Sequence, residues 1–362
     1  MTANRKQGKK RMTKRERMYR KRRKQRMLFV LGLLLVALVF TGILLVIGGK
    51  GKEQKTNDAK GEQKETELES ELETELGTGL ESESDLDAEN SQNSSKPVPT
   101  LSISDIQSKA GILVRLEDGQ VVAEKEADAA IYPASMTKIM TAIVGLENIS
   151  DLSETILITR EMYDRLYLEG ASLAGFGAGD QVQAIDILYG VMLPSGAECC
   201  VGLAEHLFGS EEAFVGKMNE KAQELGMEQT HFVTSTGLHD VNHYTTVRDM
   251  TKLLSYALKN ETFRTIYCSA SYTTNPTASA PEGLHFLSTM FKHMSSASVN
   301  GGEIEGGKTG YTSDAGQCLA SLAKVDGTEY ILVTAGAPGS PSTGSLHIED
   351  AQYVYNQIQA AE

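Results

Sequence analysis

Several signatures that would assign a function at once are missing from this chain. No Gly-x-Ser-x-Gly motif occurs, which argues against a nucleophile elbow of the α/β-hydrolase type. The four cysteines form no Cys-x-x-Cys pair and no zinc-type spacing. Gly307-Lys308-Thr309 has the ending of a phosphate loop, but no long helix follows it. We therefore reject a nucleotide-binding loop.

Charge is distributed unevenly along the 362 residues, whose net charge is −13. Residues 1–26 contain fourteen Lys/Arg and one Glu, giving +13, so the remainder sums to −26. An uncharged apolar run, Met27 to Ile47, follows at once. At 1.5 Å per residue, it would span about 31 Å as a helix, enough to cross a bilayer. Nucleic-acid binding is therefore not expected of the basic segment.

These features predict a basic cytoplasmic tail over residues 1–26 and a single transmembrane anchor over residues 27–48. A cleaved signal peptide is the alternative, but the run is longer than a usual h-region and no small-x-small cleavage site follows. Both interpretations place the rest of the chain outside the cytoplasm. Residues 49–100 are acidic and poor in aromatics, which predicts a disordered linker in spite of a leucine at every fourth position from 68 to 80.

From Leu101 onward the pattern is globular. Two strands, 111–116 and 120–125, flank Asp118-Gly119, a hairpin signal. Helical patterns and then three strand patterns follow, and the chain closes with a helix; the expected ranges are a helix from Ser135 to 146, a short strand at 155–159, helices 184–192, 197–207, 211–225 and 247–259, strands 303–308, 316–325 and 329–335, and a helix at 346–359. Strands at both ends predict one α+β domain over 101–362, with an antiparallel sheet, a helical lobe and a cleft between them.

Ser135-Met136-Thr137-Lys138 is the stretch that offers chemistry. Residues three apart on a helix share a face, so the hydroxyl and the amine are close. A serine becomes a nucleophile when a base takes its proton, and lysine can serve as that base only if burial or another cation lowers its pKa. An isolated motif of this kind is usually a helix cap beside a solvated lysine.

Two further motifs could complete such a site. Ser195 and Glu198 read as a capping box, and Ser195 could alternatively relay protons near Ser135. Lys308, Thr309 and Gly310 end a strand and could supply a cation, a hydroxyl and close backbone approach, or they could be an ordinary turn. His239, Asp240 and His243 form the only histidine cluster, but Gly237 and Asn242 predict a loop and therefore no metal site.

With these motifs in this order, the chain resembles the penicillin-recognising serine enzymes. The flanking residues narrow the resemblance to the D-alanyl-D-alanine carboxypeptidases among the low-molecular-weight penicillin-binding proteins (peptidase S11 family), over about residues 101–362. The matching stretches are Tyr132-Pro133-Ala134-Ser135-Met136-Thr137-Lys138, Ala178-Gly179-Asp180, Leu188 to Gly196, Thr236-Gly237-Leu238-His239-Asp240 and Gly307 to Thr312.

This resemblance implies a β-lactamase/DD-peptidase-like fold and a serine-type carboxypeptidase that removes the terminal D-alanine from peptidoglycan stem peptides ending in D-Ala-D-Ala. The family pattern implies Ser135 as nucleophile, Lys138 as base and Ser195 as relay; Lys308, Thr309 and Gly310 bind substrate, and the N–H groups of Ser135 and Tyr311 form the oxyanion hole. No metal or organic cofactor is implied, and β-lactams are expected as covalent inhibitors. The enzyme would be held at the cell membrane by its single N-terminal helix.

One position departs from the family pattern, in which the second motif is usually Ser-x-Asn. The third residue here is Ala197. Losing the amide would cost about 1–3 kcal/mol of transition-state binding. A DD-endopeptidase and a low-activity wall-peptide receptor on the same fold therefore remain alternatives; a β-lactamase is disfavoured, since no Glu-x-x-x-Asn loop lies between Ser195 and Lys308. The cysteines are expected to be small buried hydrophobes, with a Cys268–Cys318 disulfide left open.

Overall fold

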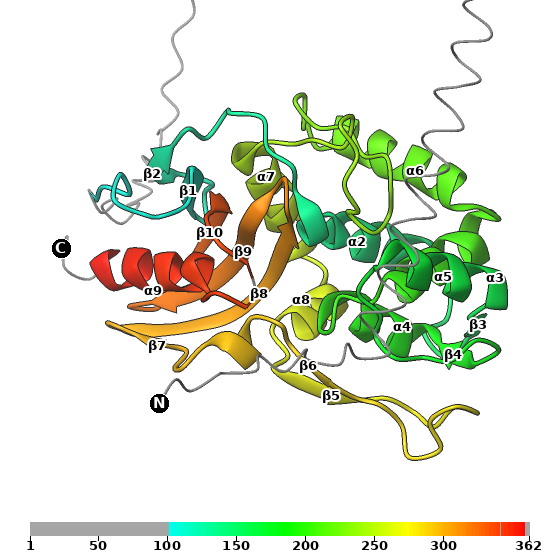
Figure 1. Ribbon diagram of the computed structural model, residues 1–362. Helices are drawn as coiled ribbons and strands as arrows, with labels where there is room; N and C mark the ends of the chain where they lie inside the picture. Colours follow the sequence, from blue (N-terminus) through cyan, green and yellow to red (C-terminus); the bar gives the residue numbers. More distant parts are fainter. Residues whose placement is uncertain (1–100, 341, 359–362) are drawn as a thin grey trace, which may run out of the picture. The chain divides into compact units, whose positions relative to one another are not determined.

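A six-stranded antiparallel sheet forms the centre of the computed structural model, which describes residues 101–340 and 342–358 (Figure 1). Its strand order is β2-β1-β10-β9-β8-β7, so the first hairpin lies beside the last strands of the chain. The strands are β1 (Ala110–Arg115), β2 (Val121–Lys125), β7 (Ser298–Val299), β8 (Gly302–Thr312), β9 (Gly316–Val325) and β10 (Thr328–Ala337). The predicted sheet, made from the first hairpin and the late strands, is confirmed.

Helices cover both faces of this sheet. The long C-terminal helix α9 (Leu346–Ile358) packs on one face, and the opposite face is contacted by α7 and α8, two members of the group that the remaining helices form (Figure 1). These are α2 (Lys138–Asn148), α3 (Arg160–Glu169), α4 (Ala184–Met192), α5 (Ala197–Phe208), α6 (Glu211–Glu224), α7 (Val247–Ala257) and α8 (Glu261–Tyr267). Each face of the sheet has its own hydrophobic core, and successive side chains of β1 alternate between the two. Ile112 and Val114 face the large helical group, whereas Leu113 faces α9.

Local chemistry accounts for the element ends. Asp326 and Gly327 both have positive φ, 47° and 76°, as a two-residue hairpin turn between β9 and β10 requires. Side chains of Thr159, Ser210, Thr246 and Asn260 cap α3, α6, α7 and α8. The sequence analysis did not predict α3 and α8. The 271–298 segment is largely irregular, with a small hairpin of β5 (Ser271–Thr273) and β6 (His285–Leu287) and a short 3₁₀ turn, η2 (Phe291–His293).

The predicted tail, anchor and linker lie outside the described residues. Within residues 101–340 and 342–358, no helix combines the length and the apolar character that a bilayer crossing demands. All four cysteines carry free thiols, so the Cys268–Cys318 disulfide that the sequence left open is not formed. Cys199, Cys200 and Cys318 are buried, in agreement with the expectation of small core residues.

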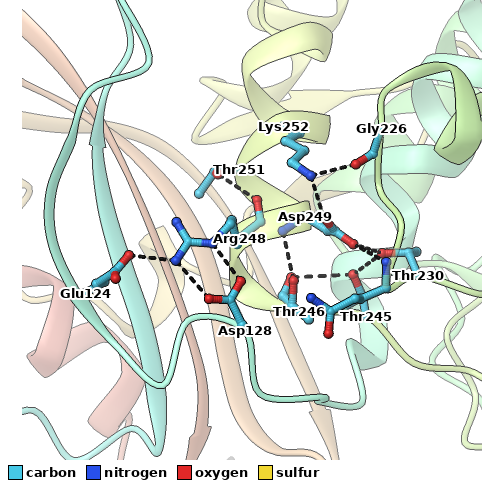
Figure 2. A network of polar contacts seen from close by, with 11 residues as sticks. Glu124, Asp128, Gly226, Thr230, Thr245, Thr246, Arg248, Asp249, Thr251 and Lys252 are labelled. Atoms are coloured by element: carbon cyan, nitrogen blue, oxygen red, sulfur yellow. Dashed lines mark hydrogen bonds and ion pairs between the residues drawn. The ribbon is translucent and has the colours of Figure 1, made fainter.

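Figure 2 shows a polar network at the start of α7. Thr246 caps the helix by accepting from the Asp249 N–H at 3.0 Å. The Asp249 carboxylate does not return to the cap; it accepts from the Gln229 N–H and the Thr230 hydroxyl at 3.0 and 2.9 Å. Asp249 therefore links residues 229–230 to the first turn of α7.

We expect Asp249→Ala to lower the free energy of unfolding by roughly 2 kcal/mol, because it removes a buried carboxylate that accepts from the Gln229 N–H and the Thr230 hydroxyl. Urea unfolding followed by circular dichroism measures the loss. The neighbouring Arg248→Ala is the control, since Arg248 pairs with the exposed Glu124 and Asp128 on the other side of the helix. An equal loss in the two variants would contradict the assignment.

Candidate active site

The turn that carries Ser135 is a short 3₁₀ helix, η1 (Ala134–Thr137), which runs directly into α2. Pro133 precedes it, as expected, and Ala134 has the unusual φ of +47°. Lys138 is the first residue of α2, and its Nζ donates to Ser135 Oγ at 3.2 Å. The predicted hydroxyl–amine pair is therefore present, although the turn is 3₁₀ and not α-helical.

Lys138 is almost completely shielded from solvent. Only 2% of the residue is exposed, and its Nζ also donates to the Thr236 carbonyl at 2.5 Å. Burial lowers the pKa of Lys138 below the ordinary 10.5, against the opposing effect of acidic groups such as Glu198. Of the two causes that the sequence analysis considered, burial and a second cation, burial is the one that lowers the pKa here.

Ser195 faces the same cleft from the loop between α4 and α5. Its hydroxyl accepts from Lys308 Nζ at 3.0 Å, and its φ of +67° is unusual for a residue with a side chain. The predicted capping box is wrong: Gly196 is the N-cap of α5 and makes no side-chain bond. The Glu198 carboxylate instead accepts from the Gly175 N–H at 2.9 Å, so Ser195 is free to interact with the lysine.

Lys308 lies on β8, fully buried behind Ser195. Its Nζ makes a second bond to the Thr309 carbonyl at 3.0 Å. Burial holds the pKa of Lys308 well below 10.5, and repulsion from the Lys138 ammonium adds to the lowering. Lys308 does not line the cavity itself, so it reaches a ligand there through Ser195 or through its field.

The approach of β8 to η1 depends on Gly310. A Cβ on Gly310 would lie 2.9 Å from the Pro133 carbonyl oxygen and 3.1 Å from the Ser135 nitrogen, so only glycine fits without a shift. β7 pairs with β8 only at Gly302 and Glu303, which leaves the Thr309–Tyr311 edge without a strand partner on the cleft side. This edge can accept an extended peptide.

These residues surround one cavity of about 270 Å³. Its lining includes Ser135, Ser195, Thr309, Gly310 and Tyr311, which come from η1, the α4–α5 loop and β8. The structure therefore brings together all the predicted site residues: Ser135, Lys138, Ser195, Lys308, Thr309, Gly310 and Tyr311.

Sequence reasoning missed part of the lining, namely Ser172, Thr289, His293, Gln317, Ser345 and His347. The buried His347 meets Gln317, with Nδ1 2.5 Å from the amide oxygen, and burial lowers the pKa of His347 to about 4. Thr289 Oγ1 lies 2.7 Å from Thr309 Oγ1. Gln317 lies at the start of β9, His293 in η2 and His347 at the start of α9, and no local sequence pattern marks any of these positions as part of a site.

The histidine cluster does not form a metal site. His239 packs edge-on against Tyr132, with ring centroids 4.7 Å apart, and His243 is hydrogen-bonded through both ring nitrogens. In the part of the chain that the structure describes, no three His, Cys, Asp or Glu side chains are arranged to hold a metal ion.

Comparison with known proteins gives a consistent result. The family described as "D-alanyl-D-alanine carboxypeptidase" matches residues 92–339. The chain is 30% identical to the D-alanyl-D-alanine carboxypeptidase DacF of Bacillus subtilis, covering 70% of this chain and 63% of that protein. It is 32% identical to DacC of Escherichia coli, covering 66% and 58%. The chain thus spans about six-tenths of the length of these two relatives.

Solved structures agree with the sequence matches. The chain is similar to the Streptomyces K15 DD-transpeptidase, with a TM-score of 0.62 and 30% identity over 70% of this chain and 98% of that one. An Escherichia coli protein named D-alanyl-D-alanine endopeptidase is also 30% identical, covering 73% of this chain and 81% of that protein.

The buried lysines predict a pH dependence of stability. Because the folded pKa of Lys138 is lowered, the unfolded chain binds more protons between that lowered value and 10.5, and stability rises with pH across this window. Across this window, we expect the free energy of unfolding of wild type to rise relative to that of Lys138→Met by up to about 1.4 kcal/mol per pH unit. Thermal or urea unfolding between pH 7 and 10.5 measures the difference.

The exposed Lys324→Met serves as the matched control, and its curve should run parallel to that of wild type. A Lys138→Met curve that also stays parallel would show that the amine keeps its proton in the folded protein.

Proposed function

The chain belongs to the D-alanyl-D-alanine carboxypeptidase family (peptidase S11), and from this premise we propose that it is a serine-type D-Ala-D-Ala carboxypeptidase acting on peptidoglycan stem peptides. One observation carries the proposal. Two serine hydroxyls in a single cavity each accept from a buried lysine, Ser135 from Lys138 at 3.2 Å and Ser195 from Lys308 at 3.0 Å.

Acylation would begin with attack of Ser135 Oγ on the carbonyl carbon of the penultimate D-alanine. The lowered pKa of Lys138 allows its neutral amine to take the hydroxyl proton as the new C–O bond forms. The C–N bond then breaks, and Ser195 relays a proton to the departing amine of the terminal D-alanine. Water hydrolyses the ester and returns Ser135 to its hydroxyl form.

Charge on the tetrahedral oxygen would be stabilised by two backbone N–H groups. Ser135 is the second residue of η1, where N–H groups have no partner inside the helix. Tyr311 offers the second N–H from the cleft edge of β8. Donors held rigidly on a helix start and a strand reorganise little during the reaction.

The terminal carboxylate of the substrate would lie against Thr309 and Gly310, with Lys308 behind them. An anion bound there favours the charged form of Lys308 and raises its pKa, so substrate binding and lysine protonation support each other. No arginine is among the described residues that line this cavity, so the positive charge behind Thr309 would come from Lys308.

Ala197 favours a second candidate, a wall-peptide receptor that binds stem peptides but turns over poorly. The alanine side chain has no amide group that could hydrogen-bond to the substrate backbone. A DD-endopeptidase on the same fold is the other alternative, in keeping with the name of one Escherichia coli relative. The three differ in product: free D-alanine, cleaved cross-links, or neither.

We propose in addition that residues 27–48 anchor the enzyme in the cell membrane, with residues 1–26 in the cytoplasm and the catalytic domain outside. The apolar run and the preceding basic segment support this. An acidic linker over residues 49–100 would give the domain reach toward the wall.

We expect labelled penicillin to acylate wild type and to leave Ser135→Ala unlabelled, because the β-lactam carbonyl meets the same nucleophile. Gel fluorescence measures labelling, and a pentapeptide ending in D-Ala-D-Ala tests turnover by D-alanine release. Ser313 is an exposed serine just after the end of β8, and the control variant Ser313→Ala should label normally. Equal labelling of Ser135→Ala would exclude the assignment.

Deleting residues 27–47 should move the protein from the membrane pellet to the soluble fraction while penicillin labelling is kept. Ultracentrifugation followed by immunoblotting measures the partition, and deletion of residues 60–80 in the linker is the control. A wild-type chain found in the soluble fraction with an intact N-terminus would contradict the anchor.

A further inference from the structure

One loop segment, Val233–Gly237, contacts both partners of the nucleophile–base pair. The Thr236 carbonyl accepts from Lys138 Nζ. The backbone of Gly237 packs on the turn before Ser135, since a Cβ there would lie 1.9 Å from the Ala134 carbonyl oxygen. The position of this segment therefore fixes both the amine and the start of η1.

His243 connects this segment to η1 by a directional chain of hydrogen bonds. Its Nδ1 accepts from the N–H groups of Val233 and Thr234, at 3.0 and 3.3 Å. Since N–H groups only donate, Nδ1 is unprotonated and the ring proton lies on Nε2. Nε2 is 2.8 Å from Thr137 Oγ1, so the ring donates to this hydroxyl, which in turn donates to the Ala134 carbonyl at 2.8 Å.

The ring is held in this state by its surroundings. His243 is 2% exposed and packs edge-on against Phe232, with centroids 5.6 Å apart. Burial lowers the pKa of His243 to about 4, with His231, Lys138 and His239 adding to the lowering and Asp240 opposing it. The neutral form, with its single donor and single acceptor, therefore prevails near pH 7.

We propose that His243 is a positioning residue for acylation, which locks the 233–237 segment against η1 and so keeps the Lys138 amine on Ser135 Oγ. It touches no substrate and acts through Thr137 on one side and through the 233–237 backbone on the other. The same hydrogen bonds end at the Ala134 carbonyl and so help to hold Ala134 at its positive φ. This inference rests on the proposed function.

Acylation by labelled penicillin, measured as a second-order rate constant on the full chain, tests the proposal. We expect His243→Leu and Thr137→Val each to slow acylation by roughly 10- to 100-fold, the scale of a misplaced catalytic group. His243→Gln should stay within about fivefold of wild type, because its amide supplies one acceptor and one donor. Thr137→Ser keeps the hydroxyl and should behave likewise.

The double variant His243→Leu/Thr137→Val distinguishes a connected chain from two separate packing effects. If the two residues act as one link, the double variant is no slower than the slower single variant. Thr334→Val is the matched control: this buried threonine lies on β10, its hydroxyl has no hydrogen-bond partner among the described residues, and its removal should leave acylation unchanged.

The outcomes separate the two levels of inference. A wild-type chain that penicillin does not label overturns the proposed function and this inference with it. A labelled wild type with an unchanged His243→Leu overturns the positioning role alone. Equal losses in His243→Leu and His243→Gln, or losses that multiply in the double variant, also overturn it. If His243→Leu does not fold, Thr137→Val against Thr137→Ser decides the question by the same criterion.

Discussion

Two lysines buried in one cleft are the constraint on which the rest of this structure depends. Each Nζ has found the same pair of partners, a serine hydroxyl and a backbone carbonyl: Ser135 and Thr236 for Lys138, Ser195 and Thr309 for Lys308. An unpaired ammonium in such a place would be costly, and the pairing limits that cost without restoring the ordinary pKa. The fold therefore has to bring η1, the α4–α5 loop, the 233–237 segment and β8 to one point.

Backbone strain accompanies both hydroxyls. Ala134, which precedes the nucleophile, and Ser195 itself have φ of +47° and +67°. Such conformations cost on the order of 1–3 kcal/mol each and persist only where neighbours enforce them. Around Ala134 the neighbours are Gly237 and Gly310, which approach too closely for any side chain. Glycine at these two positions therefore helps to position Ser135, the proposed nucleophile.

The sequence predicted what depends on local pattern and missed what depends on packing. Turn chemistry at Asp118-Gly119 and periodicity in α4 and β9 were sufficient to place these elements. The Ser-x-x-Glu pattern is a local rule that also allowed a helix cap at Ser195, and the sequence could not show that Lys308, 113 residues away, donates to its hydroxyl. The Thr236 carbonyl could not have been found, since a backbone oxygen leaves no mark on residue type. His243 was noticed, but its partners come from η1 and from the chain ten residues before it.

Ala197 is the first residue of α5 and lies where the family pattern has an asparagine. In the family pattern, an asparagine at this position contacts both the substrate backbone and the catalytic lysine. In this chain, Lys138 already has the Thr236 carbonyl as its second partner, and the Ala197 N–H donates to the Ser172 carbonyl at 2.8 Å, which fixes the start of α5 without a side chain. The Lys138 amine is therefore held without a side-chain amide at position 197, and under the proposed function the consequence of that absence falls on substrate contacts. An enzyme built this way loses affinity for a peptide backbone before it loses the ability to transfer the serine proton.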